Sequence, residues 1–304
     1  MSLRQIILLF TYIFTPSMAF SASISVPSSL NEDVKFWEMA FSKVKYNQCI
    51  VHDSHHLDIV YEVRSIRGKT RRQQYRSRIR MIKDVKNVLF KLAKGRSASS
   101  RFEKDILQSI PRKYRYKKFY KSAAYRVRCQ RGVSENFNKG LARSKKYMKM
   151  IKRLVRQKGL PEDIAYLPFL ESGFNNRAHS KVGARGLWQL MKSTARENGL
   201  KVTRHRDDRV NSYLATKTAL NILKKNYSKT NSWPLALTGY NYGINGIIRA
   251  IKKYGTSNYS KLRLRHKSRS FGFAAKNFFP SFIAARNLAK KYERRSNRKL
   301  ALRD

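Results

Sequence analysis

The segment from Leu160 to Met191 constrains the fold most, because it places a helix start, a proline and a glycine-rich turn close together. Gly159 can end the basic helix before it, and Pro161 suits the first position of a new helix. Glu162 and Asp163 follow in the first turn, where the helix dipole favours negative charge. We therefore expect a helix that begins near Pro161.

This expected helix carries one carboxylate, Glu171, among apolar residues. Ile164, Leu167 and Glu171 are spaced i, i+3 and i+7, so the carboxylate shares a face with residues that should point inward. Pro168 can kink the helix. Removal from water would raise the pKa of Glu171, as a general acid near neutral pH requires. A solvated glutamate at a helix end is the alternative that the local context leaves open.

Three motifs follow in order. The first joins ES-G-F-N, which begins at Glu171, to S-x-x-G-A-x-G-L-W-Q-L-M from Ser180 to Met191. The second is ALTGYNYGING from Ala236 to Gly246, and the third is KNFFPSFI from Lys276 to Ile283. Together they resemble the lytic transglycosylases of glycoside hydrolase family 23, which share a goose-lysozyme-like fold, and most of all the membrane-bound lytic murein transglycosylase D group. The resemblance covers roughly residues 138–290.

The resemblance implies a cleft for sugar chains, with Glu171 as the sole catalytic acid/base. The residues implied to bind the glycan are Ser180, Gln189 and Met191 beside Glu171, and Tyr240 and Asn241 on the opposite wall. Two departures from the family pattern stand out: Phe278 replaces the usual Tyr, and Ala274-Ala275 replace a Glu-Thr pair. A hydroxyl and a carboxylate near the cleft are therefore missing, which bears on rate and substrate placement. The residues at Trp188 and Met191 could equally belong to the core.

The number of carboxylates available near Glu171 limits which reaction is possible. Hydrolysis by paired carboxylates needs a second acid at about 5 to 9.5 Å from the first. No Asp or Glu occurs between Asp208 and Glu293, and the arginines around Asp207 and Asp208 should hold those two in ion pairs. A single carboxylate fits the reaction that the resemblance implies, in which Glu171 protonates the glycosidic oxygen between N-acetylmuramic acid and N-acetylglucosamine. It then takes the proton of the muramic C6 hydroxyl, which closes a 1,6-anhydro ring.

This reaction needs no cofactor and no metal. Ser180 is implied to donate a hydrogen bond to the substrate's acetamido group, while Gln189, Tyr240 and Asn241 orient the glycan. A metal site is not expected elsewhere either, since the histidines near Cys49 lack a second cysteine close by. Two alternatives remain: a lysozyme-type hydrolase of the same bond, and a catalytically weak protein that binds wall material or another polyanion.

The expected fold class is mainly α. A lysozyme-like (goose-type) helical catalytic domain would span residues 138–292, after a basic, mostly helical N-terminal region at 22–137 and before a charged tail at 293–304. In the N-terminal region, Ser29 to Glu32 reads as a capping box for a helix from Val34 to Val44. Asp58 to Ile66 reads as a short strand or an extended connection, and Tyr75 to Leu92 as a basic amphipathic helix that packs on the core.

Residues 1–21 have the pattern of a secretory signal peptide, with an apolar run from Ile6 to Ile13 and small residues around Phe20. A retained membrane anchor is the alternative. No cysteine stands near the expected cleavage site, so we expect a soluble periplasmic or secreted protein rather than a lipoprotein. Cys49 and Cys129 are the only cysteines and are expected to pair in such an oxidising compartment, with two buried thiols as the alternative.

The charge is extreme: 67 Lys and Arg against 18 Asp and Glu give a formal net charge of +49. Such a field draws a protein to polyanions. For an exported protein the expected partners are peptidoglycan glycan strands and, through electrostatic contact, anionic wall or membrane surfaces; nucleic acid is not expected. The sequence leaves the oligomeric state and the role of the basic N-terminal region open.

Overall fold

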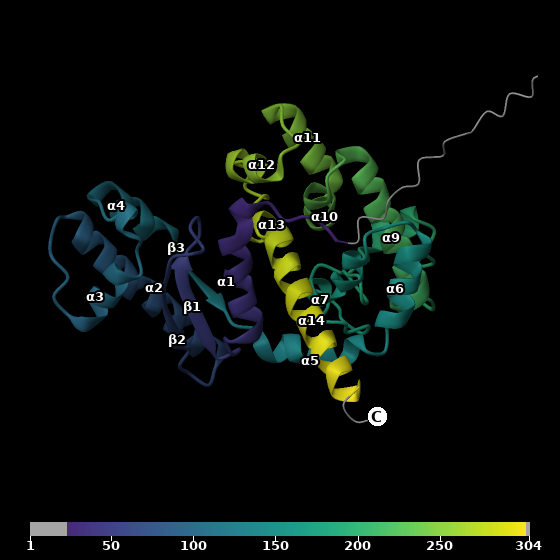
Figure 1. Ribbon diagram of the computed structural model, residues 1–304, viewed down its shortest axis with the longest axis horizontal. Helices are drawn as coiled ribbons and strands as arrows, with labels where there is room; N and C mark the ends of the chain where they lie inside the picture. The colour runs from purple at the N-terminus through teal and green to yellow at the C-terminus, as the bar shows by residue number, and fades with distance from the viewer. Residues whose placement is uncertain (1–22, 302–304) are drawn as a thin grey trace, which may run out of the picture.

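A computed structural model of the protein describes residues 23–301 (Figure 1), so the expected signal peptide lies outside the described residues. The fold is mainly α, as predicted, with one three-stranded antiparallel sheet. Among residues 23–301, no helix is both long enough and apolar enough to cross a bilayer.

The sheet lies in the N-terminal region and consists of β1 (Gln48–Asp53), β2 (Val60–Ser65) and β3 (Val127–Arg131) in the order β2-β1-β3. Strand β2 confirms the extended segment expected at Asp58 to Ile66. The other two strands were not predicted: β1 is buried along most of its length and therefore has no alternation of apolar and polar residues. A disulfide between Cys49 and Cys129 joins β1 to β3.

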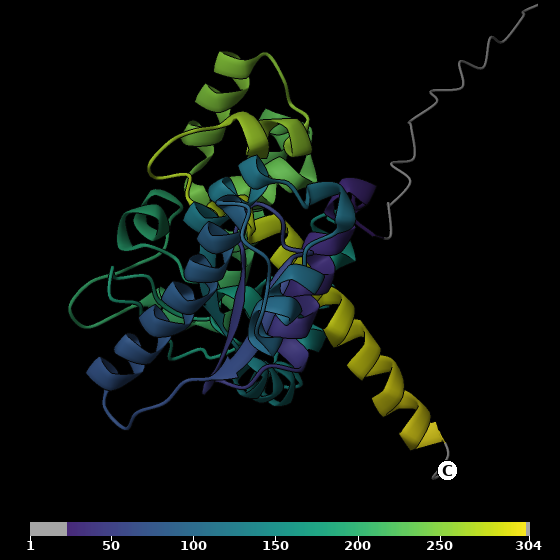
Figure 2. The same ribbon diagram turned by 90° about the vertical axis from the view of Figure 1, so that its left-hand side faces the viewer.

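Three helices cover this sheet and form a small core with it: α2 (Arg71–Ala93), α3 (Arg101–Gln108) and α4 (Lys117–Arg126). The packing expected for α2 holds for its C-terminal half, where Val85 and Leu89 are fully buried. In its N-terminal half Tyr75 and Ile79 keep 57% and 46% of their surfaces exposed. Helix α2 therefore extends beyond the core that it covers (Figure 2).

Helix α1 (Asn31–Ser42) packs against α14 (Phe278–Ala301), the long helix at the centre of Figure 1. Val34 and Phe41 of α1 thus belong to the main core of the C-terminal part of the chain. The expected capping box is absent, because Ser28–Leu30 form a 3-10 turn and no side chain caps α1. The Ser29 side chain makes a tertiary contact instead: its hydroxyl oxygen lies 2.9 Å from that of Ser260.

The C-terminal part is built from short helices around α14. They are α5 (Ser134–Ser144), α6 (Met148–Gln157), η3 (Glu162–Tyr166), α7 (Pro168–Glu171), α8 (Lys192–Glu197), η4 (Asp208–Val210), α9 (Ser212–Thr230), α10 (Trp233–Tyr242), α11 (Ile244–Tyr254), α12 (Tyr259–Arg265) and α13 (Phe273–Lys276). Helix α5 runs across residue 137, where we expected the N-terminal region to end. The charged tail expected from Glu293, as a helix end or a frayed segment, is the end of α14 as far as Ala301, and Figure 2 shows this end projecting from the body.

Candidate functional site

Glu171 lies at the end of a single α-helical turn, not on the continuous helix that the sequence predicts. The chain forms the 3-10 segment η3 (Glu162–Tyr166) and then α7 (Pro168–Glu171). Pro168 explains the break, since its ring has no amide hydrogen for the preceding turn yet suits the first position of a new one. Glu171 still lies near the residues expected around it, and the Phe169 and Phe174 rings are 4.6 Å apart between centroids.

Glu171 is partly exposed as a residue, but one oxygen of its carboxyl group is removed from water. Its Oε1 atom has no exposed surface and no hydrogen-bond partner among the described residues. Because burial disfavours the charged form, the pKa of Glu171 rises from 4.5 to about 8. The side chain therefore holds a proton at neutral pH, and no neighbouring cation opposes this.

A turn connects Glu171 to the segment from Ala178 to Met191. The Ser172 hydroxyl donates a 2.8 Å hydrogen bond to the Leu187 carbonyl, which holds the end of α7 against that segment. Within the segment, the amide of Ala184 donates to the Ser180 hydroxyl oxygen at 2.9 Å. That contact leaves the Ser180 hydroxyl hydrogen available to another acceptor.

Arg209 holds the segment from Ala178 to Met191 in place, a role that was not predicted from the sequence. Its buried guanidinium donates to the carbonyls of Gly183, at 2.8 Å, and Leu190, at 3.1 Å, and pairs with Asp207 at 2.8 Å. Gly186 lies against the Arg209 backbone with φ of +81°, and a Cβ there would collide with the Arg209 carbonyl oxygen. No local pattern marks Arg209 among so many arginines; only the expectation of ion pairs for Asp207 and Asp208 pointed to this region.

Those ion pairs are confirmed, and two further carboxylates of the region, Asp163 and Glu162, are paired as well. Asp207 binds Arg185 and Arg209, and Asp208 binds Arg206. Asp163 is fully buried between Arg286, at 2.7 Å, and Lys290, at 2.6 Å. Glu162 faces Lys152 and Arg156. These acids are therefore neutralised by neighbouring cations, in contrast to Glu171.

Trp188 and Gln189 take different positions. Trp188 is fully buried and donates from Nε1 to the Thr216 hydroxyl at 2.9 Å, so it belongs to the core. Gln189 has a left-handed backbone with φ of +47° and donates from Nε2 to the Gly186 carbonyl at 2.9 Å. Its side chain is partly exposed and lies at a groove.

The groove has a volume of about 1260 Å³ and lies between the segment from Gln189 to Met191 and helices α8 to α11. It brings together four of the predicted residues, Gln189, Met191, Tyr240 and Asn241. Met191 keeps 41% of its surface exposed there, and it directly precedes α8. Ser180 and Glu171 do not line this groove.

Tyr240 lines the groove and also interacts with the charge of Glu171. Its hydroxyl donates to the Trp188 carbonyl at 2.8 Å. Burial raises the pKa of Tyr240 well above 10, and the charge that Glu171 carries when ionised raises it further. The groove wall and the protonated carboxyl are therefore electrostatic neighbours.

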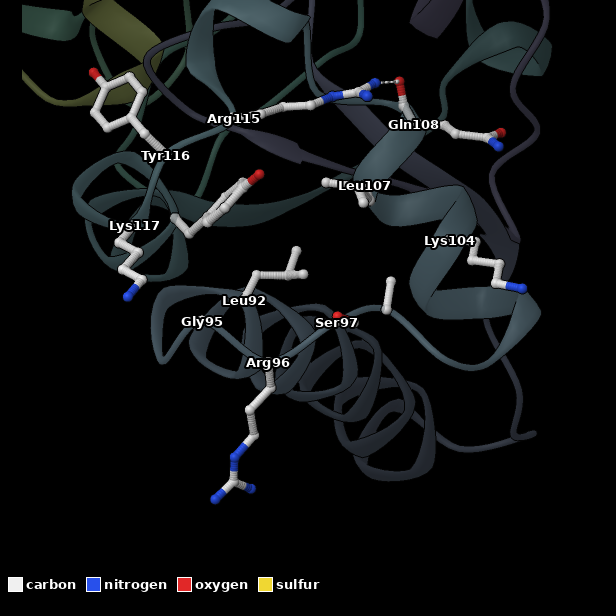
Figure 3. Close-up of a pocket in the computed structure, with 12 residues that line it drawn as sticks. Leu92, Gly95, Arg96, Ser97, Lys104, Leu107, Gln108, Arg115, Tyr116 and Lys117 are labelled. Carbon is white, nitrogen blue, oxygen red and sulfur yellow. Dashed lines mark hydrogen bonds between the residues drawn. The ribbon is translucent and has the colours of Figure 1, made fainter.

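A second cavity, of about 570 Å³, lies in the N-terminal region (Figure 3). Leu92, Leu107 and Tyr120 contribute apolar surface to it. Its charged lining residues are all cations, and Figure 3 shows Arg96 and Lys104 pointing away from the cavity centre. It contains none of the predicted site residues.

Metal ligands do not gather in the described part of the chain: over residues 23–301, no three His, Cys, Asp or Glu side chains are placed to hold a metal ion. His52, near Cys49, is buried instead between the rings of Phe36 and Phe273, with centroid distances of 4.5 and 5.5 Å.

Comparison with known proteins identifies part of the chain. Residues 148–263 match the family described as Transglycosylase SLT domain. This stretch is similar to a transglycosylase SLT domain and is called the SLT domain below. It contains Glu171, Ser180 and the four groove residues predicted from the sequence.

Two relatives in Escherichia coli match part of the chain. The membrane-bound lytic murein transglycosylase D proteins of Escherichia coli strain K12 and of Escherichia coli O6:H1 are each 36% identical to this chain over 111 residues, which is 36% of the chain and 25% of each relative. The chain thus spans about a quarter of their length. An inactive mutant of the lytic transglycosylase Slt from Pseudomonas aeruginosa aligns with 73% of this chain and 33% of its own, at 15% identity and a TM-score of 0.37.

The groove extends beyond the SLT domain on both sides. Arg128 of β3 lines it from the N-terminal region, and residues 269–275 line it from the C-terminal side. Ala274, where the family pattern has an acidic residue, is part of this wall, whereas Phe278 is buried in the main core. The carboxylate that the family pattern has at Ala274 would thus lie in the groove, whereas the hydroxyl that it has at Phe278 would lie in the core.

Proposed function

We propose that the protein is an exported peptidoglycan lytic transglycosylase. It cleaves the β-1,4 bond between N-acetylmuramic acid and N-acetylglucosamine and forms 1,6-anhydromuramic acid. The SLT domain and the murein transglycosylases that match it support the reaction class. The single observation that carries the proposal is Glu171, whose carboxyl has a buried, unpartnered Oε1 atom and a pKa of about 8 and interacts with Tyr240 on the groove wall.

The first half of the reaction uses the proton on Glu171. At neutral pH the carboxyl is protonated, so it donates that proton to the glycosidic oxygen as the bond to the anomeric carbon breaks. The substrate's own acetamido carbonyl shields the positive charge that develops at the anomeric carbon. Ser180 donates its free hydroxyl hydrogen to the acetamido group, which holds it in place.

The second half returns the proton. The ionised Glu171, in its poorly solvated position, is a strong enough base to take the proton of the C6 hydroxyl. The C6 oxygen then attacks the anomeric carbon and closes the 1,6-anhydro ring. No water enters the product, and Glu171 is protonated again for the next cycle.

The groove holds the glycan during both steps. Gln189 donates its amide hydrogens to the protein backbone, so its amide oxygen accepts from a sugar hydroxyl. Asn241 is exposed on the opposite wall, and Met191 offers an apolar surface to a sugar ring. Tyr240 uses its hydroxyl for the Trp188 carbonyl and presents its ring to the glycan.

Export is part of the proposal. The signal-peptide pattern of residues 1–21 supports it, and so does the disulfide between Cys49 and Cys129, which would be maintained in an oxidising compartment. We therefore place the mature protein in the periplasm or outside the cell.

The test is digestion of purified sacculi with the mature protein, followed by mass analysis of the fragments. A lytic transglycosylase releases muropeptides one water lighter than the reducing-end products of a lysozyme. Glu171→Gln should release none while it keeps the wild-type far-ultraviolet circular dichroism spectrum. Full activity of that variant, or reducing ends in the wild-type digest, would refute the proposal. Binding of sacculi without soluble products would favour a wall-binding protein instead.

A further inference from the structure

The groove carries far more positive than negative charge. Its charged lining residues are the cations Arg128, Lys225, Lys229, Arg249 and Arg269 and the single carboxylate Glu197. None of these five cations forms an ion pair within residues 23–301. Uncompensated like charges around one groove repel each other, so an anion bound among them is stabilised.

These cations come from separate parts of the fold. Lys225 and Lys229 lie one turn apart on α9, Arg249 lies on α11, and Arg269 lies in the segment before α13. Arg128 comes from β3, outside the SLT domain. A solvated face of one helix would not place charges on several walls of the same groove.

Arg128 is also held in a defined position. Its guanidinium carbon lies 4.4 Å from the centroid of the Phe273 ring. Phe273 in turn contacts Trp37 and His52, with ring centroids at 6.2 and 5.5 Å. A guanidinium stacked on an aromatic ring keeps its N–H groups free at its edge, where they match the two oxygens of a carboxylate.

The glycan chain itself does not need these charges. N-acetylated amino sugars are neutral, and the lactyl carboxyl of each muramic acid is consumed by the amide bond to its stem peptide. The free carboxylates of peptidoglycan therefore lie on the stem peptides, which project sideways from the chain.

We propose that the cations of the groove bind stem-peptide carboxylates, and that Arg128 is a specificity-determining residue through which the N-terminal region selects glycan strands that carry peptides over strands without them. This inference rests on the proposed function, because it concerns the same groove. It also assigns a role to part of the basic N-terminal region.

The experiment compares two substrates. One is sacculi freed of other covalently attached anionic polymers. The other is glycan strands from the same sacculi whose stem peptides have been removed by an amidase and whose freed lactyl carboxyls have then been capped as neutral methylamides. The variants are Arg128→Gln, Arg128→Lys and, as the matched control, Arg96→Gln. Arg96 lies in the same region and its loss changes the net charge equally, but it lines the second cavity instead of the groove. Activity is measured as kcat/KM for release of anhydro-ended products.

Arg128→Gln should lower kcat/KM on peptide-bearing glycan about tenfold, mainly through KM, as expected for the loss of one charge-assisted hydrogen-bonded pair. It should leave kcat/KM on peptide-free glycan unchanged. Arg128→Lys should retain part of the preference, and Arg96→Gln should behave as wild type on both substrates. An equal loss on both substrates, or no loss on either, would overturn the inference.

A binding measurement separates this inference from the proposed function. Binding to both substrates, each immobilised on the same kind of bead, is measured for Glu171→Gln alone and combined with Arg128→Gln, so that no turnover is needed. If binding depends on the stem peptides and Arg128→Gln abolishes it, the inference is supported. This holds even if the wild-type protein releases no anhydro products, because that result would refute only the proposed function. Equal binding to both substrates overturns the inference even where turnover is normal.

Discussion

The hydroxyl of Tyr240 donates a 2.8 Å hydrogen bond to the main-chain carbonyl of Trp188. This contact joins α10 to the segment from Ala178 to Met191, whose buried Trp188 is itself held by Thr216. The residue that lines the groove on one wall therefore also sets the position of the other wall. Tyr240 is accordingly a positioning residue whose hydroxyl is already used within the protein.

Tyr240→Phe should remove this one hydrogen bond and keep the ring in the groove. We expect the free energy of unfolding to fall by about 1 kcal/mol, because the Trp188 carbonyl loses its donor. Activity on sacculi should fall by a factor of a few, because the wall of the groove is no longer held in its position. Chemical unfolding and product release are the two measurements. A variant as stable as wild type but inactive would show that the hydroxyl acts on the substrate.

The raised pKa of Glu171 predicts how activity depends on pH. Since the first step needs the protonated carboxyl, turnover should fall as the pH rises through about 8. The rate on sacculi measured from pH 5 to pH 10 tests this. A fall centred near pH 4.5 instead would show that Glu171 is well solvated in the folded protein.

The same shift predicts a pH-dependent cost to stability. The folded state keeps a proton on Glu171 that the unfolded state releases above about pH 4.5, so stability is lost as the pH rises from there to about 8. Glu171→Gln should therefore be more stable than wild type at pH 8.5, by up to about 5 kcal/mol, and similar to it at pH 4. Thermal unfolding at the two pH values is the measurement. The same difference between the proteins at both values would contradict the assignment.

Gly186 should tolerate no side chain. Gly186→Ala needs a left-handed backbone, which costs about 1 kcal/mol, and its Cβ would also collide with the Arg209 carbonyl. Gly183→Ala is the matched control, because Gly183 also has a positive φ, of 89°, but has open space around it. We expect Gly186→Ala to lose at least about 2 kcal/mol more than the control, together with most activity. Equal losses in urea unfolding would show that the segment moves away from Arg209 easily.

His52 predicts a loss of stability in mild acid. Burial against Phe36 and Phe273 lowers its pKa to about 4, against a backbone contact to Asp53 that raises it. The unfolded chain binds the proton near pH 6.5 and the folded one only near 4, so stability falls as the pH drops through that window, by about 3 kcal/mol. His52→Phe should remove this dependence, and exposed His205→Gln should not. Unfolding curves at pH 7 and pH 4 decide between them.

The disulfide predicts sensitivity to reducing agents. Cys49 and Cys129 close a loop across 80 positions, and opening it should lower the free energy of unfolding by about 4 to 5 kcal/mol. The double variant Cys49→Ser with Cys129→Ser should show the same loss without a reductant. Urea midpoints that stay unchanged in dithiothreitol would contradict this.

The sequence alone was sufficient to predict those parts of the protein whose motifs and helix patterns involve residues close together in the chain. The order of the motifs was enough to find the SLT domain, and the apolar neighbours of Glu171 were enough to predict its raised pKa. The C-terminal half of α2 was expected from the spacing of Val85, Leu89 and Leu92 within Tyr75 to Leu92, because an amphipathic helix repeats its buried face every three or four residues. The break at Pro168 was visible only as a possible kink.

Tertiary structure alone decided which distant residues meet. Strands β1 and β3 are too short or too uniformly buried to show an alternating pattern, so the sheet that carries Arg128 was not predicted in full. Arg128 on Phe273 and Arg209 behind Gly186 look like any other arginines in a chain with 67 basic residues. A charge has no periodic signature along the sequence, because its effect depends on what folding brings near it, and only folding placed these cations around one groove.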